Sequence, residues 1–328
     1  MLKKIKVIPL AAESLGVRSM CTLVQTPDVV MLLDPGVSLC PMRYGLPPHP
    51  EEFRRIMQLR EAISSAAKTA QVVTVSHYHY DHHTPDHEDW LVNWTEAKNT
   101  ARQIYQDKYV LAKNYYENIN KSQRERALTF QRSNKKIFKK FEFSDGKSFC
   151  FGNQTQMVFS EAVYHGSQAS GLGYVVLVSI ICGDERFVFA PDVQGPMIAH
   201  TTDLIKTAHP QLLMIGGPPF HLLGTKVTNN ELEKAVLNLK ELVKVIPTII
   251  IDHHMLRDSN WKIKLSLVED TAVKCGHKLV TAAEFLGKEN HLLESKRNFL
   301  YLQNPPSKAF QNWMTQSGFE QSHLKPPL

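Results

Sequence analysis

The sequence lacks the features that direct a chain into or across a membrane. No apolar run approaches the roughly 20 residues of a membrane helix, and the opening MLKKIKVIPLAAESLGVRS has lysines but only a very short apolar run. The five cysteines are odd in number, scattered and never spaced as C-x-x-C. We therefore expect reduced thiols, no membrane partner and a cytoplasmic protein.

Positive charge is concentrated in one segment. The chain has 328 residues, of which 43% are hydrophobic, and a net charge of +6. Residues 95–140 hold twelve basic and four acidic side chains, a local net charge of +8, so the remainder carries −2. A mildly positive net charge does not by itself indicate nucleic-acid binding. A segment in which basic residues alternate with aromatic residues can, however, bind phosphates and stack on bases. The alternative is an amphipathic helical pair with a solvated face.

Short apolar runs predict strands in two batches, with helices between them. A chain of this kind suits two sheets packed face to face and covered by helices. Residues 87–145 and the tail from about 284 to 328 are helical in character. The predicted strands are 4–10, 20–24, 29–33 and 71–75, then 155–159, 174–181, 186–190, 212–215 and 248–251, and the clearest helices are 50–69 and 229–243.

The sharpest signal is the run SHYHYDHHTP at residues 76–85. Four histidines, His77, His79, His82 and His83, surround Asp81 directly after an apolar strand. Imidazole and carboxylate together are the ligands that a cation such as Zn²⁺, Fe²⁺ or Mn²⁺ takes. The alternative is a histidine-rich surface loop that binds no metal, and the clustering of four histidines around one aspartate argues against that alternative.

His77-x-His79-x-Asp81-His82 resembles the H-x-H-x-D-H signature of the metallo-β-lactamase superfamily. Further landmarks follow in the superfamily's order: Asp34 after an early strand, then His165, Asp192, and His253 or His254. D-H-H-T-P, G-G-P-P and D-H-H-M-L-R-D are similar to a largely archaeal branch of predicted hydrolases. The resemblance implies a single α/β domain over residues 1–328, a four-layer αββα sandwich, with a helical basic insertion at about 87–145 and a helical tail at about 284–328.

The resemblance also implies two divalent transition-metal ions, zinc first, with manganese or iron as alternatives. The first ion would be held by His77, His79 and His165. The second would be held by Asp81, His82 and the last histidine, with Asp192 shared between both. We prefer His253 to His254 as the last ligand, although the opposite register is nearly as plausible because neighbouring strand residues point to opposite faces.

Several further residues are expected to support the ligands or the chemistry. Asp34 would orient the loop of His77, and Asp252 would accept a hydrogen bond from one of the last histidine rings. Asp81 would hold a metal and orient the hydroxide that two metals generate. His83, outside the general signature, would either support a ligand or protonate a leaving group.

Three functions remain open at this level. The first is hydrolysis of a small ester-type substrate: a phosphoester, thioester or lactone. The second is a nuclease that binds RNA or DNA through the basic segment, with Lys135, Lys136, Lys139 and Lys140 as the nucleic-acid contacts. The third is a non-enzymatic metal-binding or redox-sensing protein. β-Lactamase activity itself is not expected, because no secretion signal is visible.

Overall fold

The first of two central sheets is built from the N-terminal half of the chain. The computed structural model describes residues 2–328, and this sheet has the strand order β1-β2-β3-β4-β5-β6. Strands β1 to β3 pair antiparallel, whereas β3 to β6 pair parallel. The strands are Lys6–Pro9 (β1), Thr22–Gln25 (β2), Val30–Leu33 (β3), Val72–Val75 (β4), Tyr109–Ala112 (β5) and Lys140–Phe143 (β6).

The second sheet comes from the C-terminal half, with the order β15-β14-β13-β12-β11-β8-β7. Strands β12 to β15 pair parallel, and β7, β8, β11 and β12 pair antiparallel. A separate pair, β9 and β10, lies beside it. The strands are Ser148–Phe151 (β7), Thr155–Phe159 (β8), Val163–Tyr164 (β9), Tyr174–Val175 (β10), Val178–Cys182 (β11), Glu185–Ala190 (β12), Leu212–Gly216 (β13), Thr248–Asp252 (β14) and Lys278–Val280 (β15).

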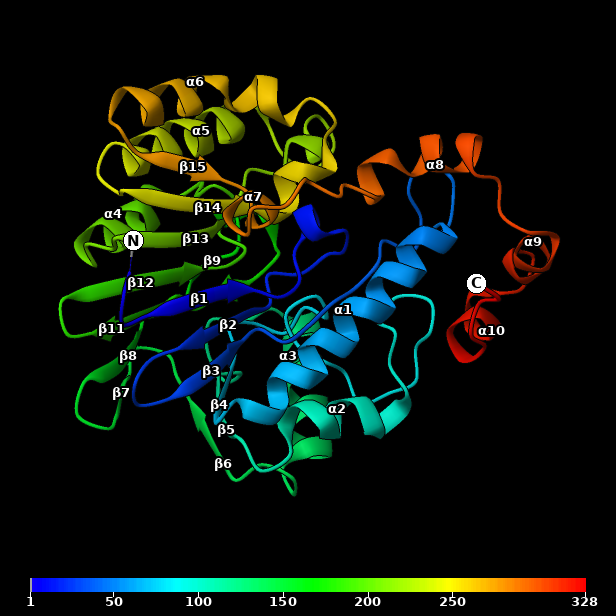
Figure 1. The fold of residues 1–328 in the computed structure, drawn as a ribbon, viewed down its shortest axis with the longest axis horizontal. Helices are drawn as coiled ribbons and strands as arrows, with labels where there is room; N and C mark the ends of the chain where they lie inside the picture. Colours follow the sequence, from blue (N-terminus) through cyan, green and yellow to red (C-terminus); the bar gives the residue numbers. More distant parts are fainter. Residues whose placement is uncertain (1) are drawn as a thin grey trace.

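Helices cover the outer face of each sheet, which gives the predicted four-layer αββα sandwich (Figure 1). Alternation in β12 shows the layering: Phe187 and Phe189 enter the core between the sheets, whereas Val188 and Ala190 enter the core beneath the second helical layer. No helix within residues 2–328 has the length and apolarity to cross a membrane. One layer holds Pro50–Thr69 (α1), Ala97–Tyr105 (α2) and Lys121–Asn134 (α3), and the other holds Ala199–Thr207 (α4), Asn229–Val243 (α5) and Trp261–Lys274 (α6).

The basic segment corrects one expectation. Residues 87–145 were expected to form a helical insertion, but only α2 and α3 are helical there, and β5 and β6 extend the first sheet in parallel. Strand β6 begins inside the lysine run, and the short apolar strand β5 lies between Lys108 and Lys113 in a segment whose many basic residues favoured a helical interpretation. The segment is therefore part of the sandwich rather than an addition to it.

The C-terminal tail is helical, as expected, and packs on α1. After the short helix Ala282–Phe285 (α7), the chain forms Arg297–Gln303 (α8), Lys308–Met314 (α9) and Gly318–His323 (α10), which lie to the right in Figure 1. Phe310 and Trp313 pack against Phe53, at ring-centroid distances of 6.0 and 5.6 Å. The fully buried Arg297 donates two hydrogen bonds to Glu52, both 2.8 Å long.

Replacing Arg297 by methionine should lower the free energy of unfolding by about 3–5 kcal/mol, because the Glu52 carboxylate would remain buried without its partner. Urea unfolding followed by circular dichroism measures the change. Arg54→Met removes a half-exposed ion pair with Glu51 on the same helix and should change stability by less than about 1 kcal/mol. Equal, small effects of the two variants would contradict the anchoring role.

Candidate metal centre

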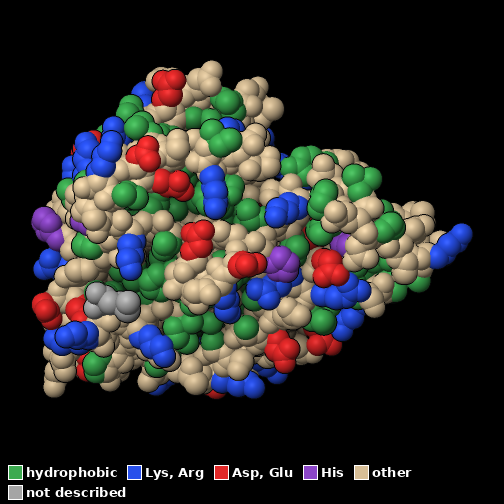
Figure 2. Space-filling view, turned by 45° about the horizontal axis from the view of Figure 1, so that its top comes forward, with side chains coloured by type: hydrophobic (Ala, Val, Ile, Leu, Met, Phe, Trp, Pro, Cys, Tyr) green, Lys and Arg blue, Asp and Glu red, His purple; other side chains and the backbone are tan. Residues whose placement is uncertain are grey.

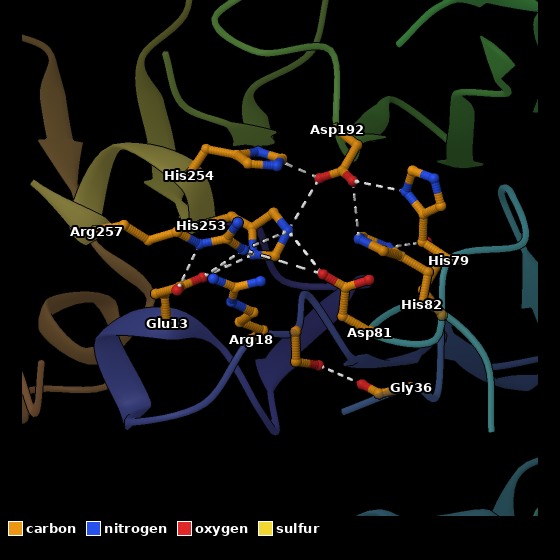
Figure 3. Close-up of polar contacts among 12 residues, drawn as sticks. Glu13, Arg18, Gly36, His79, Asp81, His82, Asp192, His253, His254 and Arg257 are labelled. Carbon is orange, nitrogen blue, oxygen red and sulfur yellow. Dashed lines mark hydrogen bonds and ion pairs between the residues drawn. The ribbon is translucent and has the colours of Figure 1, made fainter. Parts of the chain in front are cut away.

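The ordered histidines and aspartates of the sequence meet at one edge of the sandwich. The parallel strands β3, β4, β12 and β14 all end there, and the loop after each strand supplies part of the cluster (Figure 3). His165 comes from the loop that follows β9. This convergence of strand ends from both sheets explains why residues separated by more than 200 positions form a single site.

Asp192 lies at the centre of the cluster. Its side chain is 1% exposed, and its two oxygens face histidines on opposite sides. From Oδ2 the distances are 2.8 Å to His165 Nε2, 3.3 Å to His77 Nε2, 3.3 Å to His82 Nε2 and 4.0 Å to His79 Nδ1, and from Oδ1 they are 3.1 Å to His253 Nε2 and 3.6 Å to His254 Nδ1.

The ligand atoms fall into overlapping groups, each compact enough to surround one cation. Within a group the atoms all lie within 4.8 Å of one another. One group matches the first expected metal site, and another matches the second with His253 as its last member. The groups are His77, His79, His165 and Asp192; Asp81, His82 and His253; Asp192, His253 and His254; and Asp34, His77 and His82.

His253 and His254 both reach the cluster because the chain turns between them. Strand β14 ends at Asp252, and the 3-10 turn His253–Arg257 begins with His253 in the left-handed region, at φ 72°. The turn removes the strand alternation that would have separated the two rings. His253 Nε2 lies 3.4 Å from Asp81 Oδ2, whereas His254 lines the cavity above the cluster.

The competition between these two histidines gives a direct prediction. We expect His253→Ala to lose one metal ion per chain, because His253 joins Asp81 and His82 in one group. His254→Ala should keep the full complement. Plasma mass spectrometry on matched preparations counts the metal. The reverse pattern would transfer the ligand role to His254.

Asp34 supports the histidine loop in the way that the sequence suggested. Its Oδ1 accepts a 2.8 Å hydrogen bond from the Ser76 backbone N–H, and its Oδ2 accepts from the Ser76 hydroxyl and from His82 Nδ1, the latter at 2.8 Å. Gly36 follows two residues later, where a Cβ would overlap the backbone nitrogens of His82 and His83. The D-P-G turn can therefore lie directly against the ligand loop, and Asp34 fixes the orientation of the His82 ring.

Glu13 plays a role that the sequence did not reveal. It lies in the 3-10 turn Glu13–Leu15, is 5% exposed, and places Oε2 3.0 Å from His253 Nδ1. The same carboxylate accepts two hydrogen bonds from Arg257, 2.7 and 3.1 Å long. An acidic residue in the apolar sequence LAAESL was the only available signal, since nothing in the sequence connects it with His253.

The expected role of Asp252 is corrected, and the contacts of His83 favour support of a ligand residue over protonation of a leaving group. The Asp252 carboxylate accepts from backbone N–H groups of His253, Ser14 and Ala282 rather than from a histidine ring, because Glu13 already occupies the far side of the His253 ring. His83 is turned away from the ligands. Its Nδ1 donates to the His79 carbonyl at 2.9 Å, and its ring packs against Tyr78, Tyr80 and Phe130. Burial lowers its pKa to about 3, so His83 supports the loop as a neutral side chain.

Several backbone positions around the cluster are in the left-handed region, which side chains other than glycine rarely adopt. The φ angles are 45° for Asp34, 51° for Asp192, 54° for Gln194 and 72° for His253. Three of these four residues are the cluster members or supports described above, and Gln194 lines the cavity. Four of the ten non-glycine residues with positive φ among the described residues therefore lie at the site.

The protonation states agree with those of a cation site. Burial lowers the pKa values of His77, His79 and His254 and keeps these rings neutral. Burial opposes ionisation of Asp192 as well, but the surrounding histidines hold its pKa well below the usual range. Despite burial, Asp192 and Asp34 raise the pKa of His82 to about 10. A bound cation would take the place of that proton.

Unpartnered polar atoms test whether the residues fit a metal. His82 Nε2, Asp192 Oδ1 and His254 Nδ1 are buried and have no hydrogen-bond partner within residues 2–328. Buried polar atoms without partners are costly, and these three belong to the overlapping ligand groups. Histidine nitrogen and carboxylate oxygen are also suitable donors for a divalent transition metal. The cluster could therefore hold metal ions.

A cavity of about 770 Å³ opens over the cluster, with His79, Asp81, His165, Asp192 and His254 in its wall. The four lysines proposed as nucleic-acid contacts lie elsewhere. Lys135, Lys136, Lys139 and Lys140 are exposed and surround the beginning of β6. The ligand loops of this sheet instead follow the ends of β3 and β4, which run parallel to β6. Lys139 and Lys140 line a different hollow, of about 490 Å³.

The two-sheet sandwich with this ligand cluster along one edge is the fold and the ligand arrangement that the sequence resemblance to the metallo-β-lactamase superfamily predicts. No family model matches the sequence. The relatives include the UPF0282 protein MK0213 of Methanopyrus kandleri, which is 45% identical over 301 residues that span 90% of this chain and 98% of that protein. The UPF0282 protein MJ1629 of Methanocaldococcus jannaschii is 44% identical and covers 89% and 95% of the two chains. The chain belongs to the UPF0282 family.

Solved structures similar to this chain are more distant. A mutant of CmlA beta-hydroxylase shares 12% identity, with a TM-score of 0.45, over 85% of this chain and 52% of that one. The short form of human tRNase Z shares 10% identity, with a TM-score of 0.40, over 75% and 91%. The MIM-2 metallo-β-lactamase shares 12% identity, with a TM-score of 0.33, over 79% and 81%.

Proposed function

We propose that this protein is a metal-dependent hydrolase of an ester-type substrate: a phosphoester, thioester or lactone. The observation that carries the proposal is the central carboxylate of Asp192, whose two oxygens face two compact ligand groups beneath an open cavity. We assign one divalent ion, zinc first, to His77, His79 and His165, and a second to Asp81, His82 and His253, with Asp192 shared. Bound cations of this kind lower the pKa of water and polarise the oxygen of a scissile bond.

The side chains of the protein supply the remaining functions. Asp81 is the more exposed carboxylate of the cluster, at 16%, and lines the cavity, where it can accept a proton from a water molecule. Asp34 and Glu13 orient the His82 and His253 rings from behind. The ligands are therefore held in place before a substrate enters, which favours catalysis over loose metal storage.

Metal reconstitution tests the proposal. Purified protein stripped with a chelator and reloaded with Zn²⁺, Mn²⁺ or Fe²⁺ should take up two ions per chain and hydrolyse at least one generic phosphoester, thioester or lactone. Chelator should abolish hydrolysis, and metal should restore it. Protein that stays folded and never takes up any of the three ions would overturn the proposal. Stoichiometric metal uptake with no hydrolysis would favour a metal-binding or redox-sensing role.

The position of the basic residues separates this function from a nuclease. We change Lys135, Lys136, Lys139 and Lys140 to Gln and expect the rate of ester hydrolysis to stay within about twofold of the wild type. These lysines are distant from the cavity, and salt screens the electrostatic effect of exposed charges over such distances. Most aromatic rings of the segment are packed inside, and Tyr116 is the exception at 67% exposure. Salt-dependent RNA or DNA binding that disappears with the four charges would instead support the nuclease.

A further inference from the structure

Three positive side chains line the cavity without an acidic partner. Arg43, Arg126 and Lys226 all lie in its wall, and no ion pair joins them to a carboxylate of residues 2–328. The other two arginines of the cavity differ, since Arg18 is paired with Glu294 and Arg257 with Glu13, at 2.6 and 2.7 Å. These three cations outnumber the two carboxylates of the same wall, Asp81 and Asp192, so among the described residues the cavity has an excess of positive charge.

Arg126 is held beside the ligand loop by uncharged groups. Its guanidinium carbon lies 4.9 Å from the centroid of the Tyr80 ring, and Nη1 donates a 3.4 Å hydrogen bond to the Tyr78 carbonyl. Tyr80 lies between His79 and Asp81 in the sequence and also lines the cavity. These contacts fix the position of the guanidinium and leave its charge available. In this way α3, from the basic segment, contributes one side chain to the site.

Arg43 is fixed in a similar way on the side of the second ligand group. Its Nη2 donates to the Arg257 carbonyl at 2.8 Å, and its guanidinium lies 4.8 Å from the Tyr44 ring centroid. Within residues 2–328, Arg43 Nε is buried without a hydrogen-bond partner, and so is Nδ1 of His221, another residue of the cavity wall. Burial, together with Arg257 and Arg43, lowers the pKa of His221 to about 3, so the ring is neutral. Both nitrogens lack a partner that a substrate could supply.

We propose that the substrate is a phosphoester whose charged oxygens bind Arg126 and Arg43, with Lys226 and His221 as further contacts. This inference rests on the proposed hydrolase function. A neutral thioester or lactone would leave these cations unpaired, whereas phosphoryl oxygens carry the matching charge and suit the planar fork of arginine. In the hydrolysis, the oxygen of water bonds to phosphorus, the bond from phosphorus to the leaving oxygen breaks, and a water proton ends on that oxygen.

Charge-removal variants of the metal-loaded protein test this assignment. Arg126→Met and Arg43→Met should each lower kcat/KM for bis(p-nitrophenyl) phosphate by about 10- to 100-fold, as expected for loss of a charged hydrogen bond. Each variant should weaken the binding of inorganic phosphate, measured by calorimetry, to a similar degree. Arg132→Met is the matched control, since Arg132 is exposed on α3 and outside the cavity, and it should match the wild type. Metal content should remain unchanged in all three variants.

The outcomes separate this inference from the proposed function. The phosphoester assignment would be overturned if the protein hydrolyses a neutral thioester or lactone but no phosphoester, and if neither Arg126→Met nor Arg43→Met changes phosphate binding. The hydrolase proposal would stand in that case. The assignment would also be overturned if hydrolysis of a carboxylate-bearing thioester required the same two arginines while no phosphoester was hydrolysed. If no ester is hydrolysed, the hydrolase proposal fails, and phosphate binding that requires both arginines would still support the anion site.

Discussion

Asp192→Asn should leave the protein folded but unable to retain either metal ion. Asp192 faces six histidine rings, and its two oxygens serve different ligand groups. An amide of the same shape lacks the negative charge and presents N–H hydrogens to one group. We expect metal content to fall from two ions per chain to nearly zero after buffer exchange. Loss of a residue that only hydrogen-bonds to a metal ligand lowers metal affinity by about 10- to 100-fold, and we expect a larger loss for Asp192→Asn.

Asp81→Asn is the control for this experiment, because it makes the same chemical change at a carboxylate that belongs to one group only. This variant should lose one ion and keep the ion held by His77, His79 and His165. Plasma mass spectrometry and circular dichroism on both variants separate metal loss from unfolding. If Asp192→Asn retained two ions, Asp192 would not be the shared ligand.

Glu13→Leu should destabilise the metal-free protein by about 3–5 kcal/mol, because it leaves the Arg257 guanidinium buried without its partner. The double variant Glu13→Leu/Arg257→Leu should recover much of this loss, since both charges are then removed. Glu51→Leu, at a half-exposed ion pair, should cost less than about 1 kcal/mol. Chemical unfolding of the four proteins measures the differences.

The Glu13 effect should also depend on pH. Burial would raise the pKa of Glu13, but Arg257 and His253 together lower it below its ordinary value of 4.5. A carboxyl group with a lowered pKa stabilises the fold above the pKa of the unfolded state and loses that contribution as the pH falls. The gap between wild type and Glu13→Leu should therefore narrow below about pH 4.5. A gap that stays constant down to pH 3 would show that the carboxylate charge is not responsible.

The ligand cluster could be anticipated because its signals are local in the sequence. The run from His77 to His82 follows an apolar strand, and His253 stands directly after a strand that is recognisable by its branched residues. Asp192 follows the apolar and aromatic run Phe-Val-Phe-Ala of β12, with Pro191 between them. The helix at 50–69 and the one at 229–243 have the predicted bounds, since proline at the start of one and a Thr228–Glu231 capping box at the start of the other mark their first turns.

The unanticipated features depend on contacts between distant segments. Glu13 and His253 are 240 positions apart, and only the assembly of both sheets brings them together. The short strand β6 is stabilised by pairing with β5 rather than by its own lysine-rich sequence, so its composition predicts little. The direction of the His83 ring follows from the backbone turn, in which His82 and His83 both donate to the His79 carbonyl, and sequence spacing does not reveal it.

The left-handed residues around the cluster have a consequence for any attempt to make this protein more heat-resistant. Gln194, at φ 54°, would lose its backbone strain as glycine, whereas the same change at Asp34, Asp192 or His253 would also remove buried polar contacts. Selection for thermal endurance alone would therefore favour glycine at Gln194, in the wall of the cavity. Libraries screened only for melting temperature should accumulate stable, inactive variants there, and a parallel screen for turnover would be needed to exclude them.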